Sequence, residues 1–367
     1  MGEKMKSPAT ISPVQLFFII LQTQIGIGLI SIPYTVQEGA GKDGWISILL
    51  AGLFVQGGIA VIWLLSSRFP GLTFYDFAPL LVGKIIGTVL TMMYMLFFFV
   101  MVCYQLSVFL AISSNWAFPR TPHVVFAVLT VAVSVYLAKE NLRIIGRFHI
   151  LASFLLVSII FVLLPLIPHF EMRYLLPFAS NGVEDIMKGV GKTFNTAFAG
   201  FELLLWLYPF TEGSKTAKWK AVAGANAATS IIYAILAFAS SAIFSPEEIK
   251  VVPEPVLYII KEAELIVVER IDLLFLTVWA VFVLTTMISY LYVASTGLTH
   301  LLKAKEHKKS LYVLAVLVIP VAIATENRME LMRIGDKINS VSIILLFVIP
   351  AFLLMVALIR KKREESV

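Results

Sequence analysis

The stretch Gln24-Ile25-Gly26-Ile27-Gly28 interrupts the first long apolar run of the chain. Unwinding a helix frees backbone N–H and C=O groups, which are costly in hydrocarbon. A break inside a membrane helix therefore persists only where it lines a cavity or a ligand. A later apolar run is interrupted in a similar way at Ala197-Phe198-Ala199-Gly200-Phe201-Glu202. If both runs are membrane spans, the two interruptions predict a binding site between broken helices.

The composition is that of a membrane protein. Of the 367 residues, 59% are hydrophobic and only 14% are charged, whereas soluble domains are nearer half apolar and a quarter charged. The apolar residues form runs of about 20, the length at which a helix crosses the hydrocarbon core. We therefore expect one transmembrane domain over residues 1–367, embedded in a lipid bilayer. We interpret the net charge of +6 as a signal of membrane topology, and we expect no nucleic-acid partner.

About ten spans are expected, with boundaries uncertain by several residues. The fourth and ninth are the shortest of them. The expected spans lie near residues 14–36, 44–66, 84–116, 121–138, 144–168, 188–210, 218–244, 271–300, 310–326 and 338–360.

Charge predicts the orientation. An even number of spans places both termini on one side, and 18 of the 29 Lys and Arg residues belong to loops and span ends on that side. Cytoplasmic loops carry the excess of basic residues, so both termini are expected in the cytoplasm. The outer loop 245–270 is acidic, and Ser245-Pro246 is typical of a helix start. We expect an interfacial helix in this loop, the alternative being an ordinary solvated loop.

The types of span repeat after five. Spans one and six are interrupted, and spans three and eight are long, at about 45–50 Å for 1.5 Å per residue. Five is an odd number of crossings, so the two five-helix repeats, 1–180 and 181–360, are expected to be inverted. Inverted repeats with broken first helices are a recurring transporter architecture that binds substrate near the midplane. The alternative is that the glycines only let helices pack closely.

Glu202 is a carboxylate deep inside a span. Placing an ionisable group there costs several kcal/mol by most estimates, so such residues usually serve a function. Glu202 is expected to hold a proton, bind a ligand amine or gate one side of the site. The alternative is a protonated, structural carboxyl group.

Further polar residues occur in spans three, five and eight. Thr286 and Tyr290 are four residues apart and share one helix face, so with Tyr94 they are candidates to close a pocket. Each is also a candidate for simple packing, and Tyr104 and Tyr292 for interfacial anchors. His149, near the cytoplasmic end of span five, is either structural or a group that titrates near neutrality.

The motifs of an enzyme are missing from the sequence. It contains no Gly-rich phosphate loop and no His pair suited to zinc, and its lone cysteine, Cys103, cannot form an internal disulfide. We therefore expect no enzymatic activity, no metal and no cofactor.

The two breaks resemble those of a known superfamily. Gly-Ile-Gly-Leu-Ile-Ser-Ile-Pro at 26–33 resembles the broken first helix of the amino acid–polyamine–organocation superfamily, and Ala199-Gly200-Phe201-Glu202 resembles the break in its sixth helix. Over nearly its whole length the chain resembles the endospore germination permeases, the B subunits of spore nutrient germinant receptors. Asp43-Gly44-Trp45, Val278-Trp279, Thr285-Thr286 and a short basic C-terminus support this resemblance.

The resemblance implies a multi-pass protein of the spore inner membrane that acts with germinant receptor A and C subunits. It would bind a small nutrient, typically an amino acid, and the bound nutrient would bias a conformational equilibrium that starts germination. Span five lacks the lysine that proton-coupled members of the superfamily can carry. The resemblance places the ligand-binding pocket at Gly26, Ile27, Gly28, Tyr94, Ala199, Gly200, Phe201, Glu202, Thr286 and Tyr290.

Two functions require this same pocket. The first is a nutrient sensor within a receptor complex, and the second is a proton-coupled amino acid transporter. A channel opened by ligand is an extension of the first. The sequence alone does not separate them.

Overall fold

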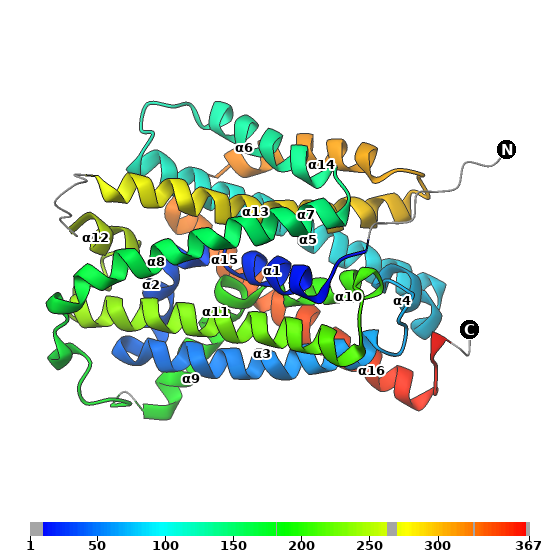
Figure 1. Cartoon of the computed structure of the whole chain (residues 1–367), viewed down its shortest axis with the longest axis horizontal. Helices are drawn as coiled ribbons and strands as arrows, with labels where there is room; N and C mark the ends of the chain where they lie inside the picture. Colours follow the sequence, from blue (N-terminus) through cyan, green and yellow to red (C-terminus); the bar gives the residue numbers. More distant parts are fainter. Residues whose placement is uncertain (1–9, 181, 263–269, 326, 365–367) are drawn as a thin grey trace.

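The protein is all-helical in the computed structural model, which describes residues 10–180, 182–262, 270–325 and 327–364. Within these residues the helices form ten transmembrane segments and no β-strand, apart from one isolated bridge between Ile11 and Thr211. Most segments run along the long axis of the molecule (Figure 1).

The first five segments follow the expected order. Segment one is broken, segment three is a single long helix, and segment five changes from α to 3-10 geometry. Their helices are α1 (Pro13–Gln24) with α2 (Gly28–Ala40), α3 (Gly44–Ser66), α5 (Lys84–Trp116), α6 (His123–Ala138), and α7 (Leu142–Ser153) with η2 (Phe154–Leu156), α8 (Val157–Leu163) and η3 (Leu164–His169).

The second five segments repeat this order. Segment six is broken, segment eight is long, and segment ten contains a π-helical stretch. Their helices are α9 (Gly182–Phe198) with η5 (Phe201–Leu203), α10 (Leu204–Leu207) and η6 (Tyr208–Phe210), α11 (Lys215–Ile243), α13 (Ile271–Leu301), α14 (His307–Ile323), and α15 (Arg328–Ile343) with η7 (Ile344–Val348) and α16 (Ile349–Ile359).

The four segments that fall short of a full span occupy matching places in the two halves. Six helical stretches of the described residues are long and apolar enough to cross a membrane by length and composition. One of these stretches, Gly28–Ser66, joins α2 of the first segment to α3. The segments without a full stretch of their own are the broken first and sixth, and the short fourth and ninth, α6 with 16 residues and α14 with 17. Departures from the ideal span thus recur at an interval of five segments.

Two predicted boundaries are wrong. The tenth segment begins at Arg328 and not near residue 338, and the sixth begins at Gly182 and not near residue 188. The side chain of Asn327 caps α15 by accepting the Met329 N–H at 2.9 Å. The first turns of both helices carry charged residues, a pattern that hydropathy assigns to loops. A helix can nevertheless continue beyond the hydrocarbon core.

The broken helices lie in the centre of the bundle. α1 and α2 pack against α11 and α9, and the long helices α5 and α13 pack on each other and enclose the centre from the other side (Figure 1). Large apolar side chains such as Leu53, Ile85, Leu129 and Phe161 point outward and are exposed, as expected for a surface covered by lipid.

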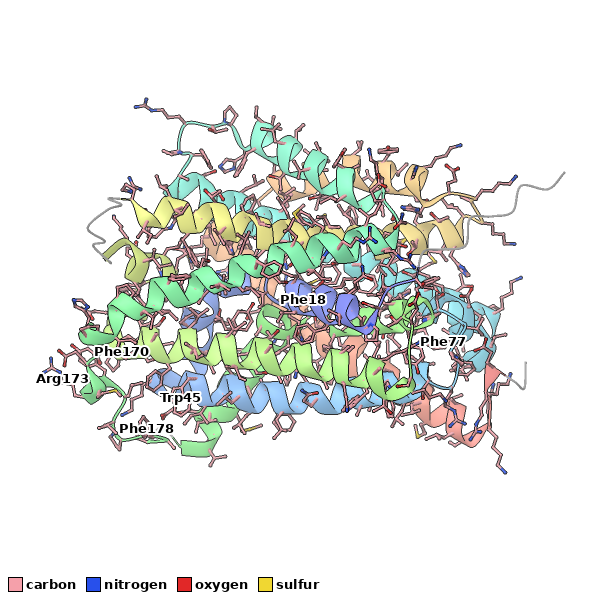
Figure 2. All side chains as sticks on the ribbon, viewed as in Figure 1. Phe18, Trp45, Phe77, Phe170, Arg173 and Phe178 are labelled. Carbon is pink, nitrogen blue, oxygen red and sulfur yellow. The ribbon has the colours of Figure 1, made fainter. Side chains whose placement is uncertain are left out.

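The two described ends of the chain lie at the same end of the bundle, here named the terminal end. Ile11 N–H donates to Phe210 O at 2.8 Å, and Glu364 N–H donates to Arg68 O at 3.0 Å. An even number of crossings follows from this arrangement. At the opposite, distal end, Trp45 packs edge-to-face against Phe178 at a centroid distance of 6.0 Å (Figure 2), as expected for an interfacial aromatic belt.

Residues 245–262 of the loop 245–270 cover part of the distal end (Figure 1). Ser245 N–H donates to Glu248 Oε2 at 2.8 Å, and hydrogen bonds from Ser245 lower the pKa of Glu248. The residues after this cap form turns, and the helix of this loop is α12 (Pro255–Glu262), which buries Leu257 and Ile260 in the core of the bundle. The expected interfacial helix continues into 263–269, outside the described residues, and stays a prediction.

Candidate functional site

Side chains of α5 and α13 fill the break between α1 and α2. A Cβ atom at Gly26 would lie 2.8 Å from Thr286 Oγ1 and 3.1 Å from the carboxamide of Gln105. The absence of a side chain at Gly26 therefore lets both groups approach the backbone. Trp279 Nε1 donates to Gly26 O at 3.2 Å. The Ile27 N–H donates to Gln105 Oε1 at 3.3 Å, so the polar groups that the break frees find partners from neighbouring helices.

The break after α9 depends on a glycine and a buried carboxylate. Gly200 has a φ of +131°, a backbone conformation that L side chains rarely adopt,. Its N–H donates to Glu202 Oε2 at 2.6 Å, and Tyr290 of α13 donates its hydroxyl to Glu202 Oε1 at 3.0 Å. Glu202 is fully buried. Each carboxylate oxygen therefore has a donor, as a buried charged or polar group requires.

Gln24 joins the two breaks. Its Nε2 donates to Phe198 O, the last carbonyl of α9, at 3.0 Å. Its Oε1 accepts the Thr229 hydroxyl at 2.9 Å, and its backbone O accepts the Tyr233 hydroxyl at 2.9 Å. A single side chain of α1 thus connects the end of α9 with α11, so the two broken helices and α11 form one buried polar network.

A second network surrounds His149 of α7. His149 is fully buried, and its Nδ1 lies 2.8 Å from Ile145 O. Its Nε2 lies 3.0 Å from Ser289 Oγ and 3.2 Å from Thr285 O, both on α13. The Thr23 hydroxyl donates to Ser289 Oγ at 2.9 Å. This network connects segments one, five and eight on the side of the break that faces the terminal end.

Tyr94 lies apart from the breaks. Its hydroxyl donates to Leu345 O, in the π-helical stretch where the regular backbone pattern is altered. Its ring packs on Trp206 and Phe98, with centroids at 5.3 Å and 6.2 Å. Phe98 in turn stacks on Tyr290 at 5.6 Å. Tyr94 is therefore connected to Glu202 through Phe98 and Tyr290, within an aromatic cluster.

The predicted site residues fall into two groups. Those of the breaks, together with Thr286 and Tyr290, are brought together in the centre of the protein, and Tyr94 is not. The residues brought together are Gly26, Ile27, Gly28, Ala199, Gly200, Phe201, Glu202, Thr286 and Tyr290, all of them buried.

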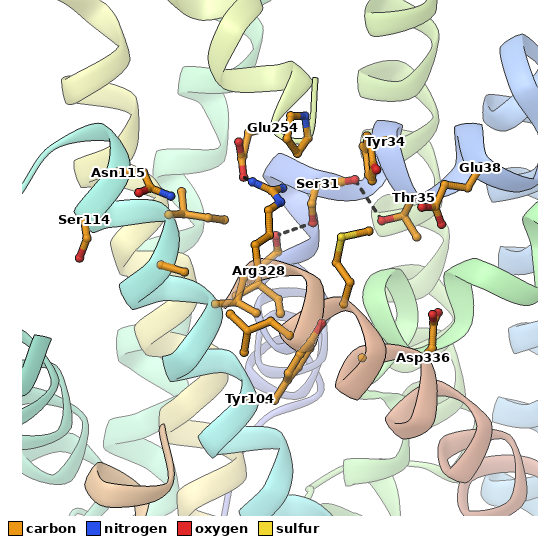
Figure 3. A pocket seen from close by; sticks show the side chains of 18 of the residues that line it. Ser31, Tyr34, Thr35, Glu38, Tyr104, Ser114, Asn115, Glu254, Arg328 and Asp336 are labelled. Atoms are coloured by element: carbon orange, nitrogen blue, oxygen red, sulfur yellow. Dashed lines mark hydrogen bonds and ion pairs between the residues drawn. The ribbon is translucent and has the colours of Figure 1, made fainter. Parts of the chain in front are cut away.

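A cavity of about 490 Å³ opens from the distal side of this centre (Figure 3). We name it the distal cavity. It lies between α2, α5 and α15, and Lys192 of α9 and the loop at Pro253–Glu254 complete its wall. Of the predicted site residues, Ile27 alone lines the cavity as the structure describes it. The cavity therefore reaches the first break without including the groups packed behind it.

Two ion-pair clusters line the distal cavity. Arg328 pairs with Glu254, joining α15 to the loop before α12. Lys192 Nζ lies 3.3 Å from both Glu38 Oε2 and Asp336 Oδ1, joining α9 to α2 and α15. These charged residues, like Gln24 and Gln105, were missed as site residues. In the sequence, each of them is a polar side chain inside, or just beyond, an apolar run, and this pattern could have identified them.

Comparisons with known proteins agree with this architecture. A model of the family described as spore germination protein matches residues 10–330. The chain is similar to spore germination protein YndE of Bacillus subtilis (strain 168), with 25% identity covering 98% of this chain and 100% of that protein. It is also similar to spore germination protein GerQB of Bacillus cereus, with 27% identity covering 84% of each.

Two solved transporter structures have a similar fold. MhsT in complex with L-phenylalanine superposes with a TM-score of 0.64 at 14% identity, covering 96% of this chain and 99% of that one. Mhp1, a nucleobase-cation-symport-1 family transporter, superposes with a TM-score of 0.68 at 14% identity, covering all of this chain and 83% of that one.

Together, the helix order and these similarities define the protein class. The fold is an all-α membrane fold of five plus five inverted helices in which helices one and six are broken. The family that matches and the two solved structures that superpose share this permease and transporter architecture. The chain belongs to the spore germination protein family, and within it to the B-type permeases of germinant receptors.

Proposed function

We propose that this protein is the transporter-fold subunit of a spore germinant receptor, and that it binds a small nutrient, an amino acid above all, between the broken helices. The observation that carries the proposal is the buried Glu202, which bonds both to the break after α9 and to Tyr290. The Gln24–Phe198 hydrogen bond places the other break beside it.

The two breaks offer different chemistry to a ligand. The first turn of α2 presents backbone N–H groups, which suit a carboxylate because of their partial positive charge. Glu202 presents a carboxylate, which suits an amine. An amino acid carries both groups, so its two ends would be recognised by the two halves of the fold.

Gln105 occupies the position of the ligand carboxylate in this proposal. Its Oε1 accepts the Ile27 N–H, the bond that a carboxylate oxygen would make. Gln105 is buried, and it lies about one helical turn before Val108, a residue of the cavity wall,. A nutrient entering through the distal cavity would displace this carboxamide and take its hydrogen bond.

Binding at this place would shift a conformational equilibrium. A ligand that contacts both breaks favours the conformation in which the two halves approach, and it can shift the equilibrium only by its difference in affinity for the two states. We propose that the shift is passed to germinant receptor A and C subunits in the spore inner membrane. In this arrangement the termini lie in the cytoplasm and the distal cavity opens to the other side.

A proton-coupled amino acid transporter is the second candidate function. The observation that favours it is His149, a fully buried titratable residue that contacts α13 and, through Ser289, the first segment. Proton coupling needs such a group inside the membrane. The two candidates share the binding site and differ in whether the nutrient crosses.

The experiment combines binding with uptake. Purified full-length protein is screened by thermal shift against amino acids, sugars and nucleosides, and the compound that stabilises it is then offered, labelled, to proteoliposomes. Stabilisation without uptake is the result expected for a sensor. Uptake that Glu202→Gln abolishes would instead establish the transporter. A wild-type protein that no nutrient stabilises would contradict both.

A further inference from the structure

The distal cavity has the size of a binding site in its own right. Its volume of about 490 Å³ falls within the range of roughly 300–1,000 Å³ that is typical of ligand pockets. It shares only Ile27 with the predicted pocket at the breaks.

Among the residues that the structure describes, the charges of the wall leave one carboxylate in excess. Arg328 and Glu254 neutralise each other, and the Glu254 side chain is only 6% exposed. Lys192 serves two carboxylates, Glu38 and Asp336, at 3.3 Å each. The Asp336 side chain is 63% exposed, so it remains accessible to a cation. The other titratable groups of the described wall are His123 and the tyrosines Tyr34 and Tyr104. This balance favours a positive group over an anion.

Helix α5 adds an apolar stretch to the wall, which lies in sequence between Tyr104 and the polar Ser114 and Asn115. Val108, Ala111 and Ile112 of α5 line the cavity. The Tyr104 hydroxyl occupies the space that a side chain at Gly335 would fill. A ligand that fits both parts of the wall has a positive group at one end and an apolar body at the other.

The two charge clusters are too far apart to be bridged by one amino acid backbone. Arg328 and Asp336 are separated by eight positions of α15, or roughly 12 Å along the axis at 1.5 Å per residue. An ammonium group held near Asp336 therefore leaves its own α-carboxylate far from Arg328. The nearer cation, Lys192, is already paired with Glu38 and Asp336 at 3.3 Å each. With two carboxylates and one ammonium, this cluster would recognise the amine in preference to the carboxylate.

We propose that the distal cavity is a second binding site, which takes an organic amine with an apolar body at the Glu38–Lys192–Asp336 cluster. This inference goes beyond the proposed function, because it concerns other residues and a different selectivity. The site at the breaks requires a carboxylate on the ligand, whereas the distal site does not.

Three probes that share the isobutyl side chain of leucine separate the two sites. L-Leucine carries both charged groups, isoamylamine carries only the amine, and isocaproate carries only the carboxylate. Binding to purified full-length protein is measured by thermal shift and by the dissociation constant from scintillation proximity. The distal site predicts that isoamylamine binds and isocaproate does not. No binding of isoamylamine, or binding of isocaproate that Asp336→Asn alters as much as it alters binding of isoamylamine, overturns the inference.

Matched variants assign the binding to the cavity. Asp336→Asn is expected to weaken isoamylamine binding at least about tenfold, as for loss of a charged hydrogen-bond partner. Glu330→Gln removes the same charge from an exposed position of α15 outside the cavity wall and should leave binding unchanged. Equal effects of the two variants overturn the inference. Gly26→Ala perturbs only the break, so its effect on nutrient response tests the proposed function separately.

Discussion

The hydroxyl of Tyr290 donates to Glu202 at 3.0 Å, and through this bond the long helix α13 meets the break of the sixth segment in the protein interior. One turn earlier on the same helix, Thr286 reaches the break of the first segment. Because the two residues share a face, α13 contacts both breaks along one line of side chains. The candidate site therefore lies along this face of α13, at the centre of the fold.

The Tyr290–Glu202 bond should contribute to stability. Tyr290→Phe leaves a buried carboxylate oxygen without its donor, which costs about 1–3 kcal/mol. We expect a lower melting temperature for the purified protein in detergent. Tyr312→Phe, which removes a hydroxyl from a half-exposed tyrosine of α14, is the matched control. Equal melting temperatures of the two variants would show that the bond carries no stability.

Gly200 should not tolerate a side chain. Alanine at this position would keep a φ of +131° and place its Cβ 3.0 Å from the Thr23 side chain and 3.2 Å from Gln24 N. A backbone strain of this kind costs about 1–3 kcal/mol, so the melting temperature is expected to fall. At Gly191 of α9 an added Cβ meets no atom within 4 Å, and Gly191→Ala should be neutral or stabilising. A neutral Gly200→Ala would mean that the break can relax.

Gln105 is predicted to compete with the ligand. Gln105→Ala frees the Ile27 N–H and should tighten binding of a carboxylate-bearing nutrient, whereas Gln105→Glu places a carboxylate of the protein there and should abolish it. Dissociation constants of the two variants, measured side by side, test this. If Gln105→Ala weakens binding instead, the carboxamide is a contact of the ligand and not its substitute.

The Arg328–Glu254 pair should hold the loop before α12 on α15. Glu254 is nearly buried, with its side chain 6% exposed, so Arg328→Met leaves an uncompensated charge and should destabilise the protein more than Glu254→Gln does. A double-mutant cycle on melting temperatures measures the coupling. Additive effects of the two substitutions would show that the pair does not couple the loop to the helix.

The fold was largely predictable from the sequence because the thickness of a membrane sets the length of the helices that cross it. The broken first and sixth segments, the long third and eighth, and the short fourth and ninth were all visible as interruptions or lengths of apolar runs. The start of α15 was not, because Arg328, Arg333 and Asp336 reduce its hydropathy although the helix continues to the distal cavity.

The site was predictable only in part. Glycines and a lone carboxylate mark a break, so Gly26, Gly200 and Glu202 could be identified from the sequence. The partners of the break could not, because Gln105 and Trp279 become neighbours only through packing of α5 and α13. Tyr94, which the resemblance placed in the pocket, lies in the aromatic cluster with Phe98 and Trp206.

Nutrient recognition at the breaks is tested most directly by the germination response of spores that carry Glu202→Gln together with intact A and C subunits. The rate of germination is recorded against the concentration of the nutrient found by the thermal-shift screen, at matched protein levels and with Glu330→Gln as the control. We predict that the half-maximal concentration rises at least about tenfold, or that the response is lost. A response curve identical to that of the control would contradict the proposal that the nutrient binds between the broken helices.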